Sequence, residues 1–293
     1  MADIKAYIKS KREGLADSSI TTYSSILKSL YKKIWGEEKM DFEKFREHKT
    51  ILDGLKDMPP NKRKTILSAL FIITEIPQYR SLMMEDSNAY AKEIAQNKKT
   101  ETQEENWVEP AEIEAVLNKL EKDASAIYKK QTKTPQDLQE VQNYIIMALL
   151  SGKYIPTRRS KDYTDFKIKN ATEEDNYIEG KKNLVFNSYK TAKTYGRQTL
   201  TLPVKLKNIL NKWIAINPTD YLLFDVNMNP LTNVKLNQRI NKIFDGKKVS
   251  TNNLRHTNIT EALGDHKASK KKAEKLMSDM GSSFNMVDTY YKE

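Results

Sequence analysis

The stretch TPQDLQEVQNYIIMALLSGKYIPTRRSKDY, residues 134–163, decides how the second half of this chain folds. Its opening Thr-Pro pair suits the start of a helix, because proline is favoured in the first helical turn. The apolar run through Leu149 predicts a buried helix that ends near Gly152. Arg159 follows directly, so we expect a core helix to position this arginine.

On the C-terminal side of this stretch, the apolar period becomes strand-like between about residues 164 and 203. The segments TDFKI, NLVFN and RQTLTLP predict three short strands, with turns at GKK and TAKTYG. Lys190 then lies on the arm or at the tip of a hairpin. Helical periodicity returns from Val204 onward. The predicted fold is therefore mainly α with one small antiparallel β-sheet.

On the N-terminal side, residues 1–95 predict a separate helical domain. Apolar side chains recur at three- and four-residue intervals over residues 20–34. The candidate capping residues are Asp17, Ser18 and Ser19 for this helix and Asn61 for a later one. Further helices are predicted over 41–55 and 86–95. Residues 96–106 contain almost nothing to bury and predict a linker, and a second packed domain spans 107–293.

Lysine and arginine outnumber aspartate and glutamate by 50 to 39, which gives a net charge of +11 and a pI near 9.3. Basic proteins commonly bind polyanions, and nucleic acid is the leading candidate. The alternative is an ordinary solvated surface. From Ser151 to Lys212, fourteen basic residues stand against six acidic ones. The excess therefore concentrates around the arginines and the hairpin, as a phosphate-binding surface requires.

The composition also excludes several classes of site. The chain has no cysteine, which excludes disulfides and thiolate zinc sites, and its three histidines show no metal-ligand spacing. No stretch approaches the roughly 18 apolar residues of a membrane span, and no secretory signal is present at the N-terminus. We expect a soluble, intracellular protein with no membrane partner, no metal and no other cofactor.

Arg159, Lys190, Arg255 and the pair Tyr290 and Tyr291 are, in that order, suited to attack on a phosphodiester. A tyrosine hydroxyl titrates near pH 10, so it needs cationic groups that stabilise the charge building on phosphate oxygens. The planar guanidinium of arginine binds two phosphate oxygens at once, whereas the ammonium of lysine is a mobile point charge that also donates a proton.

These residues resemble the tyrosine recombinase (phage integrase) family, whose catalytic domain shares its fold with type IB topoisomerases. Arg159 with Asp162 three residues later is similar to the family's first-arginine motif. The LRH triplet at residues 254–256 resembles its second-arginine signature, and Lys190 in a YKT context resembles its β-hairpin lysine.

The C-terminal motif extends the resemblance over the whole chain. Gly281 and the nine-residue interval from Ser282 to Tyr291 match the family's glycine, histidine and nucleophilic tyrosine. The resemblance implies a helical, SAM-like core-binding domain at 1–95 and a catalytic domain at 107–293.

Two positions depart from the family's pattern. Ser282 stands where the family usually has histidine, and Asn252 replaces the common histidine or lysine three residues before the second arginine. Each change removes a titratable group, and general acid-base assistance is typically worth about 10² to 10⁴ in rate. Both side chains still donate hydrogen bonds to phosphate oxygens. Activity is therefore open at this point.

Several alternatives remain. Arg158 is the alternate for Arg159, Lys193 for Lys190 and Tyr290 for Tyr291. We expect Asp162 to orient the guanidinium of Arg159. We expect His256 to pack behind Arg255 rather than to transfer a proton.

The resemblance implies a site-specific DNA recombinase or integrase that works as a homo-tetramer on two double-stranded DNA sites. The tyrosine forms a 3′-phosphotyrosyl bond, which a 5′ hydroxyl later displaces, so neither ATP nor a metal is needed. Such enzymes commonly serve integration or excision of viral or other mobile elements. Two alternative functions remain: a catalytically weakened DNA-binding relative of the family and a monomeric type IB topoisomerase.

Overall fold

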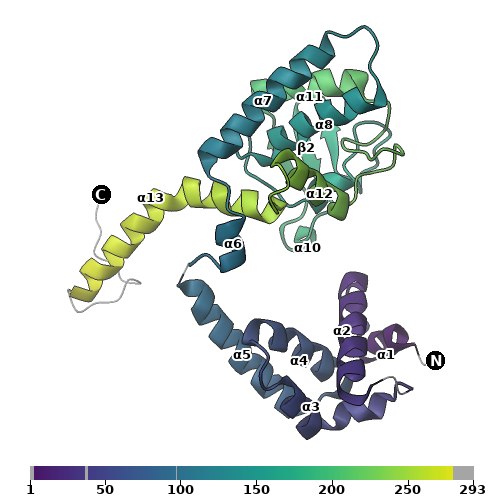
Figure 1. Cartoon of the computed structure of the whole chain (residues 1–293), viewed down its shortest axis with the longest axis vertical. Coiled ribbons are helices and arrows are strands. Elements are labelled where there is room, and N and C mark those ends of the chain that lie inside the picture. The colour runs from purple at the N-terminus through teal and green to yellow at the C-terminus, as the bar shows by residue number, and fades with distance from the viewer. Residues whose placement is uncertain (1–2, 37–38, 97, 280–293) are drawn as a thin grey trace. The chain divides into compact units, whose positions relative to one another are not determined.

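A computed structural model describes residues 3–36, 39–96 and 98–279 of the chain. The chain divides into two compact units, Met1–Lys99 and Thr100–Glu293, each with its own hydrophobic core (Figure 1). The boundary falls inside the segment predicted as a linker.

The first unit is helical throughout its described residues. Its elements are α1 (Ile4–Lys11), α2 (Asp17–Trp35), the 3-10 helix η1 (Phe42–Arg46), α3 (His48–Leu55), α4 (Pro60–Thr74) and α5 (Pro77–Ala95). The segment predicted as one helix over 41–55 is two, because Glu47 leaves the helical region with φ −71° and ψ 61°. Helix α5 begins at Pro77, nine residues before the predicted start at Asp86.

The predicted capping residues of this unit are wrong. Helix α2 begins after Ala16 and α4 begins after Pro59, and neither has a side-chain cap. Asp17, Ser18, Ser19 and Asn61 lie within the helices. Pro60 explains the start of α4, since its fixed φ suits the first helical position, where the missing N–H costs no hydrogen bond.

Helix α4 lies at the centre of the first core, where Leu67, Leu70 and Ile73 are almost fully buried. An ion pair joins α4 to α5. The guanidinium of Arg63 donates to both carboxylate oxygens of Asp86, at 2.9 and 2.7 Å, and the Asp86 side chain is 3% exposed. Two parallel N–H···O bonds fix the rotation of one helix against the other.

The second unit combines helices with a small sheet. Its helices are α6 (Glu101–Glu105), α7 (Pro110–Tyr128), α8 (Pro135–Leu150), α9 (Lys161–Thr164), α10 (Ala192–Tyr195), α11 (Val204–Ile216), α12 (Asn233–Ile243) and α13 (Thr251–Asp279). Its strands are β1 (Tyr177–Glu179), β2 (Asn183–Phe186) and β3 (Gln198–Thr201). The predicted class, mainly α with a small antiparallel sheet, is confirmed.

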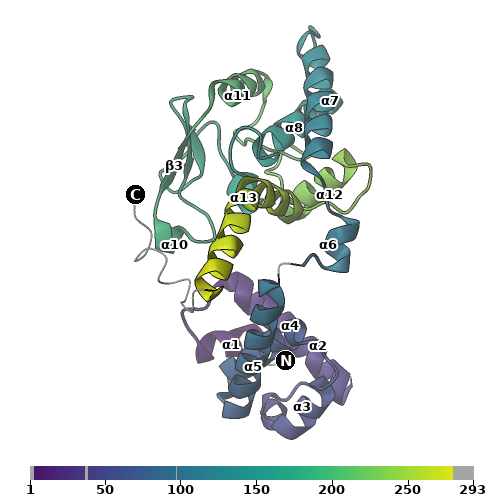
Figure 2. The ribbon, with the colours of Figure 1, turned by 90° about the vertical axis from the view of Figure 1, so that its left-hand side faces the viewer.

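Helix α8 is the core element of this unit. Residues 144–150 are all buried, and α8 packs against α7, α11, α12 and α13. Figure 2 shows α8 between α11 and α7. Its N-terminus is a capping box, in which the Thr134 hydroxyl accepts from the Asp137 N–H at 3.1 Å while the Asp137 carboxylate accepts from the Thr134 N–H at 2.9 Å. The predicted start at Thr134 and Pro135 is confirmed.

Within the described residues, the strands form one antiparallel sheet in the order β1-β2-β3. The predicted strand TDFKI is wrong: Lys167 makes only isolated bridges with Tyr177 and Tyr221, and Thr164 ends α9. The turn at GKK is confirmed, with Gly180 and Lys181 both at positive φ. The TAKTYG segment contains α10 and joins β2 to β3.

Part of the predicted linker is ordered in the second unit. Thr100 and Gln103 form a capping box that starts α6. The Asn106 side chain is buried and accepts from the Lys248 N–H at 3.0 Å. Contacts of this polar kind leave no apolar pattern in the sequence of residues 96–106. The sequence therefore predicted only a linker. No helix in the described part of the chain is long and apolar enough to cross a membrane.

The ion pair between Arg63 and Asp86 gives a stability prediction. Asp86→Ala is expected to lower the free energy of unfolding of the first unit by about 3–5 kcal/mol, because it leaves a largely buried guanidinium unpaired. Urea unfolding of the full chain, followed by hydrogen exchange of peptides from α4 and α5, measures it. The control is Asp53→Ala, which removes a solvent-exposed partner of Lys56 and should leave the urea midpoint unchanged. Equal effects of the two changes would contradict the prediction.

Candidate active site

The loop after α8 brings the first arginines to a fixed position. Gly152 ends the helix at φ +77°, and a Cβ there would collide with the side-chain amide of Asn258 on α13. A glycine is therefore required both by the backbone conformation and by the close approach of α13. This contact holds the start of the loop against α13.

Thr157 connects this loop to both helices. Its hydroxyl donates to the carbonyl of Leu150 at 2.9 Å, and its N–H donates to Asn258 Oδ1 at 3.2 Å. Its carbonyl accepts from Arg255 Nε at 3.1 Å. One residue therefore fixes the backbone immediately before Arg158 and Arg159 and also orients the side chain of Arg255.

The start of α13 is itself anchored. The Ser250 hydroxyl accepts from the Asn253 N–H at 3.3 Å, and the Thr257 hydroxyl donates to the Val108 carbonyl at 2.8 Å. In the LRH triplet Leu254 is fully buried and Arg255 half-buried, whereas His256 is exposed. The predicted packing role of His256 is therefore wrong, since its position in the helix turns it away from the core.

The two adjacent arginines have different environments. Arg158 donates from Nε to Asp162 Oδ2 at 2.8 Å and from Nη1 to Gln198 Oε1 at 2.9 Å. Its guanidinium carbon lies 3.9 Å from the centre of the Phe186 ring. Arg158 is thus a structural link between α9 and the sheet. We predicted that Asp162 orients Arg159, and in the described structure this is wrong. Asp162 lies about one helical turn from both arginines, but its carboxylate pairs with Arg158.

The side chain of Arg159 has no hydrogen-bond partner among the described residues, and the residue is only half-buried. It lies close enough to Arg255 for the two charges to interact: burial, and then the charge of Arg159, lower the pKa of Arg255. Arg255 uses only Nε, so its two terminal nitrogens have no partner in the described part of the chain. The bond to Thr157, two residues before Arg159, brings the Arg255 side chain to the loop that carries Arg159, and both guanidinium groups have donors without a described partner.

Asp162 is the acidic group within this cluster. Burial raises its pKa, and the charges of Arg158, Arg159 and Arg255 oppose that shift. Its Oδ1 is buried and has no hydrogen-bond partner in the described structure. The carboxylate is 3% exposed, so it balances part of the positive charge from within the protein rather than at the surface.

Lys190 lies four residues after β2, in the connection to β3, and its side chain is exposed. The preceding residue, Tyr189, is buried, and its ring centre is 5.3 Å from the guanidinium carbon of Arg158. The Tyr189 hydroxyl donates to the Gly196 carbonyl at 2.7 Å. The connection between β2 and β3 that carries Lys190, residues 187–197, is called the lysine loop below. Its base packs against Arg158, which forms the arginine cluster together with Arg159 and Arg255. Lys193, on α10, is also exposed.

The remaining predicted residues are only partly described. Asn252 lies exposed in the first turn of α13, three residues before Arg255. Ser282, Tyr290 and Tyr291 lie outside the described residues. The roles assigned to these positions from the sequence stay predictions.

Sequence reasoning missed the residues that hold the site together. Thr157, Asn176, Gln198 and Asn258 all bond to backbone or side chains far away in the sequence. None belongs to a motif, and single threonines, asparagines and glutamines are common on surfaces. Only the position of Thr157 immediately before the arginine pair offered a signal.

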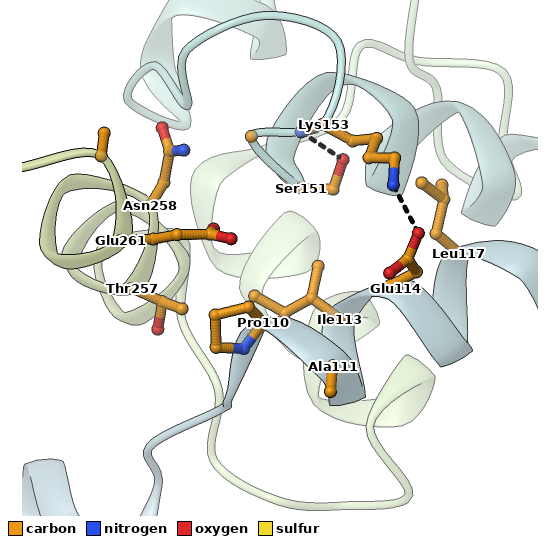
Figure 3. A pocket seen from close by; sticks show the side chains of 12 residues that line it. Pro110, Ala111, Ile113, Glu114, Leu117, Ser151, Lys153, Thr257, Asn258 and Glu261 are labelled. Atoms are coloured by element: carbon orange, nitrogen blue, oxygen red, sulfur yellow. Dashed lines mark hydrogen bonds and ion pairs between the residues drawn. The ribbon is translucent and has the colours of Figure 1, made fainter.

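A cavity of about 470 Å³ lies beside this region, between α7, the loop after α8 and α13 (Figure 3). Lys153 bonds to Glu114 across its wall, and Asn258 and Glu261 face it from α13. None of the described predicted site residues lines it. No group of three or more His, Asp or Glu residues with metal-site geometry occurs among the described residues.

No family model matches the chain, and no curated protein matches it. Among solved structures, a lambda integrase dimer bound to a COC' core site matches with 14% identity and a TM-score of 0.46, over 93% of this chain and 72% of that one. XerA recombinase matches with 12% identity and a TM-score of 0.37, over 89% of this chain and 83% of that one.

A lambda integrase tetramer bound to a Holliday junction matches with 13% identity and a TM-score of 0.44, over 89% of this chain and 69% of that one. These are structures of tyrosine recombinases, the family that the sequence motifs resemble. With identities of 12–14% and TM-scores below 0.5, the functional inference depends on the geometry of this chain.

The two arginines should differ in their effect on stability. Arg158→Ala is expected to lower the free energy of unfolding of the second unit by about 3 kcal/mol or more, because it leaves Asp162 buried without its partner. Arg159→Ala should change it by less than about 0.5 kcal/mol, since no described contact is lost. Urea unfolding with hydrogen exchange of peptides from α9 and β2 measures both. A larger loss from Arg159→Ala would contradict the assignment.

The effect of Arg158→Ala should also depend on pH. Without Arg158, burial raises the pKa of Asp162 further, so the folded variant holds its proton more tightly than the unfolded chain. A folded-state pKa above the unfolded value means that stability is gained as pH falls. The deficit relative to wild type should therefore shrink as the pH is lowered. The same comparison in an Asp162→Asn background should lose this pH dependence, and a deficit that persists unchanged at low pH would contradict the explanation.

Proposed function

We propose that this chain is a tyrosine recombinase that breaks and rejoins DNA through a covalent phosphotyrosyl intermediate. The observation that carries the proposal is the bond between Arg255 Nε and the carbonyl of Thr157, which brings Arg255 to the loop that carries Arg159, while the terminal donors of both guanidinium groups have no described partner. Two neighbouring cations with unused donors suit the binding of one anion, and a DNA phosphate has the required chemistry.

The reaction follows from the charges. The hydroxyl of Tyr291 gives its proton to solvent water and attacks the phosphorus, and the bond to the 5′ oxygen breaks. Negative charge grows on the non-bridging oxygens during this step, where Arg159 and Arg255 stabilise it without rearrangement. The 5′ oxygen leaves as a hydroxyl after taking a proton from Lys190, with Lys193 as the alternate. Attack by a 5′ hydroxyl on the phosphotyrosyl bond reverses these steps and restores the tyrosine.

Asn252 and Ser282 take hydrogen-bonding roles in this scheme. Neither side chain titrates, so each donates to a phosphate oxygen rather than transferring a proton. Asn252 has the better support, because it is exposed one helical turn before Arg255. Proton transfer then depends on the lysine, which is why the lysine loop matters for the rate.

Double-stranded DNA is the proposed substrate, and the proposed assembly is a homo-tetramer on two DNA sites. The first unit, residues 1–95 within Met1–Lys99, serves as the core-binding domain, and residues 107–293 serve as the catalytic domain. Integration or excision of a viral or other mobile element is the proposed biological setting. The net charge of +11 supports binding to DNA but not any particular sequence.

A second candidate function is DNA binding without catalysis. The observation that favours it is the loss of two titratable groups, at Asn252 and Ser282, from positions where the family carries them. The arginine pair would then bind phosphate without turnover. A monomeric type IB topoisomerase is a third candidate, and its products are relaxed circles rather than joints between two duplexes.

Covalent trapping tests the proposed function. Wild-type protein is incubated with a pool of nicked suicide duplexes of randomised sequence, and protein-linked DNA is recovered after denaturation. We expect an adduct that disappears with Tyr291→Phe and persists with Tyr290→Phe. Arg159→Ala and Arg255→Ala should each slow its formation by about 10² or more, as expected for loss of a donor to a developing oxyanion.

The controls separate the three candidate functions. Lys122→Ala removes an exposed cation on α7, and it should leave the rate of adduct formation unchanged. Wild-type protein that binds the DNA but forms no adduct would contradict the recombinase and support the non-catalytic binder. Relaxation of supercoiled plasmid without joints between two marked duplexes would support the topoisomerase.

A further inference from the structure

Asn176 is a buried polar residue outside the set of predicted site residues. It lies immediately before β1 and is 4% exposed. Its own carbonyl accepts from the Lys167 N–H at 2.7 Å, which holds its backbone against the segment after α9. A buried amide with unmatched hydrogen-bonding groups is costly, so the partners of its side chain show what it does in the fold.

The side chain of Asn176 forms four hydrogen bonds with the backbone. Its Nδ2 donates to the carbonyl of Asp162 at 3.0 Å and to the carbonyl of Ser188 at 2.8 Å. Its Oδ1 accepts from the N–H groups of Asn187 and Ser188, each at 2.8 Å. Both donors and both acceptor sites of the amide are used.

These bonds connect two elements of the candidate site. Asp162 lies in α9, directly after the arginine pair, and its carboxylate binds Arg158. Ser188 lies two residues before Lys190, and both of its backbone polar groups are bound by the same amide. Asn176 therefore continues the hydrogen bonding of β2 past its last residue, at the point where the strand ladder stops.

The consequence is a short, fixed path from the arginines to the lysine. Tyr189 is buried, and its hydroxyl is bonded to the Gly196 carbonyl, so the chain up to Lys190 has few free torsions. The exposed Lys190 side chain then projects from a fixed backbone. Without Asn176, four backbone groups at the base of the loop would have no partner, and water would compete for them.

We infer that Asn176 is a positioning residue for Lys190: by binding the carbonyl of Asp162 and the backbone of Asn187 and Ser188, it holds the lysine loop in register with the arginine cluster. This inference rests on the proposed function, in which Lys190 protonates the leaving 5′ oxygen. Only asparagine supplies two donors and an acceptor at this length, because aspartate lacks the donors and glutamine places its amide one methylene further away.

Two suicide duplexes that differ in one atom test the inference. The cleaved sequence recovered by trapping is made with either oxygen or sulfur at the bridging 5′ position of the scissile bond. A thiol titrates near 8.5, so sulfur leaves as a thiolate without a proton donor, whereas the far more basic oxygen needs one. Single-turnover adduct formation is measured on both substrates for wild type, Lys190→Ala, Asn176→Ala and Arg159→Ala.

Asn176→Ala should behave like Lys190→Ala. Both are expected to lose about 10²-fold on the oxygen substrate, at the lower end of the range for general acid catalysis, and to approach the wild-type rate on sulfur. Arg159→Ala should be slow on both, because its contacts are to the non-bridging oxygens. The matched control is Asn183→Ala, at an asparagine of β2 whose side chain bonds, among the described residues, to the Glu179 side chain alone. It should leave the ratio of the two rates unchanged.

Hydrogen exchange tests the structural half of the inference without DNA. The amides of Asn187 and Ser188 should be protected in wild type and should exchange faster in Asn176→Ala, while the amides of α8 stay protected. If Asn176→Ala does not fold, Asn176→Asp replaces it, since the carboxylate still accepts from both amides but donates to neither carbonyl. Asn176→Asp should keep the protection of the two amides and lose rate on the oxygen substrate.

The outcomes separate this inference from the proposed function. A wild-type adduct combined with an Asn176 variant that is equally slow on oxygen and sulfur overturns the positioning role alone. Unchanged exchange at Asn187 and Ser188 in Asn176→Ala overturns it as well. If wild type forms no adduct on either substrate, the proposed function fails, and the catalytic role of Asn176 fails with it.

Discussion

The candidate site depends on holding two positive charges close together before any anion arrives. Arg159 and Arg255 repel each other, and this repulsion together with burial lowers the pKa of Arg255. Left to themselves, two long side chains on separate elements would turn apart into water. The loop and α13 prevent this for Arg255 because its Nε is bonded to the carbonyl of Thr157. The packing of α8 and α13 therefore opposes the repulsion, which the phosphate of the proposed reaction would relieve.

Arg158 and Arg159, which follow α8, have separate tasks that one residue could not perform together. Asp162 is buried and needs a counter-charge, and Arg158 supplies it while also bonding to Gln198 and packing on Phe186. Because Arg158 pairs with the carboxylate through Oδ2, Arg159 keeps its donors for the proposed ligand. If Asp162 bound Arg159 instead, that guanidinium would have to break an ion pair before it bound phosphate. A site that is already arranged for its anion avoids this cost.

The sequence predicts the elements whose signals are local. The apolar run over residues 134–150 and the Thr-Pro pair predict α8, and NLVFN after the turn at GKK predicts β2, whereas β1 was not predicted. The predicted strand at TDFKI is wrong because alternation of side chains does not show whether a partner strand is present. In the described structure Lys167 makes only isolated bridges there. The predicted pairing of Asp162 with Arg159 is also wrong, since intervals of three and four residues both span about one helical turn and the sequence does not distinguish them. Phe186 and Gln198 hold Arg158 beside Asp162, and both are brought there only by the fold.

Arg159 and Arg255, which stay charged, lie on different elements from Lys190, the proposed proton donor. Arg159 and Arg255 are on the loop after α8 and on α13, whereas Lys190 is on the connection between two strands. A guanidinium stays charged and cannot give up a proton at neutral pH, so the two functions need different residues and hence different elements. Their relative position is set by contacts that join α9 to the sheet: Arg158 against Phe186 and Tyr189, and Asn176 between Asp162 and Ser188. A change that loosens these contacts moves the proton donor relative to the charges. In the proposed reaction, stabilisation of the phosphate and protonation of the leaving oxygen would therefore be coupled through residues that touch neither.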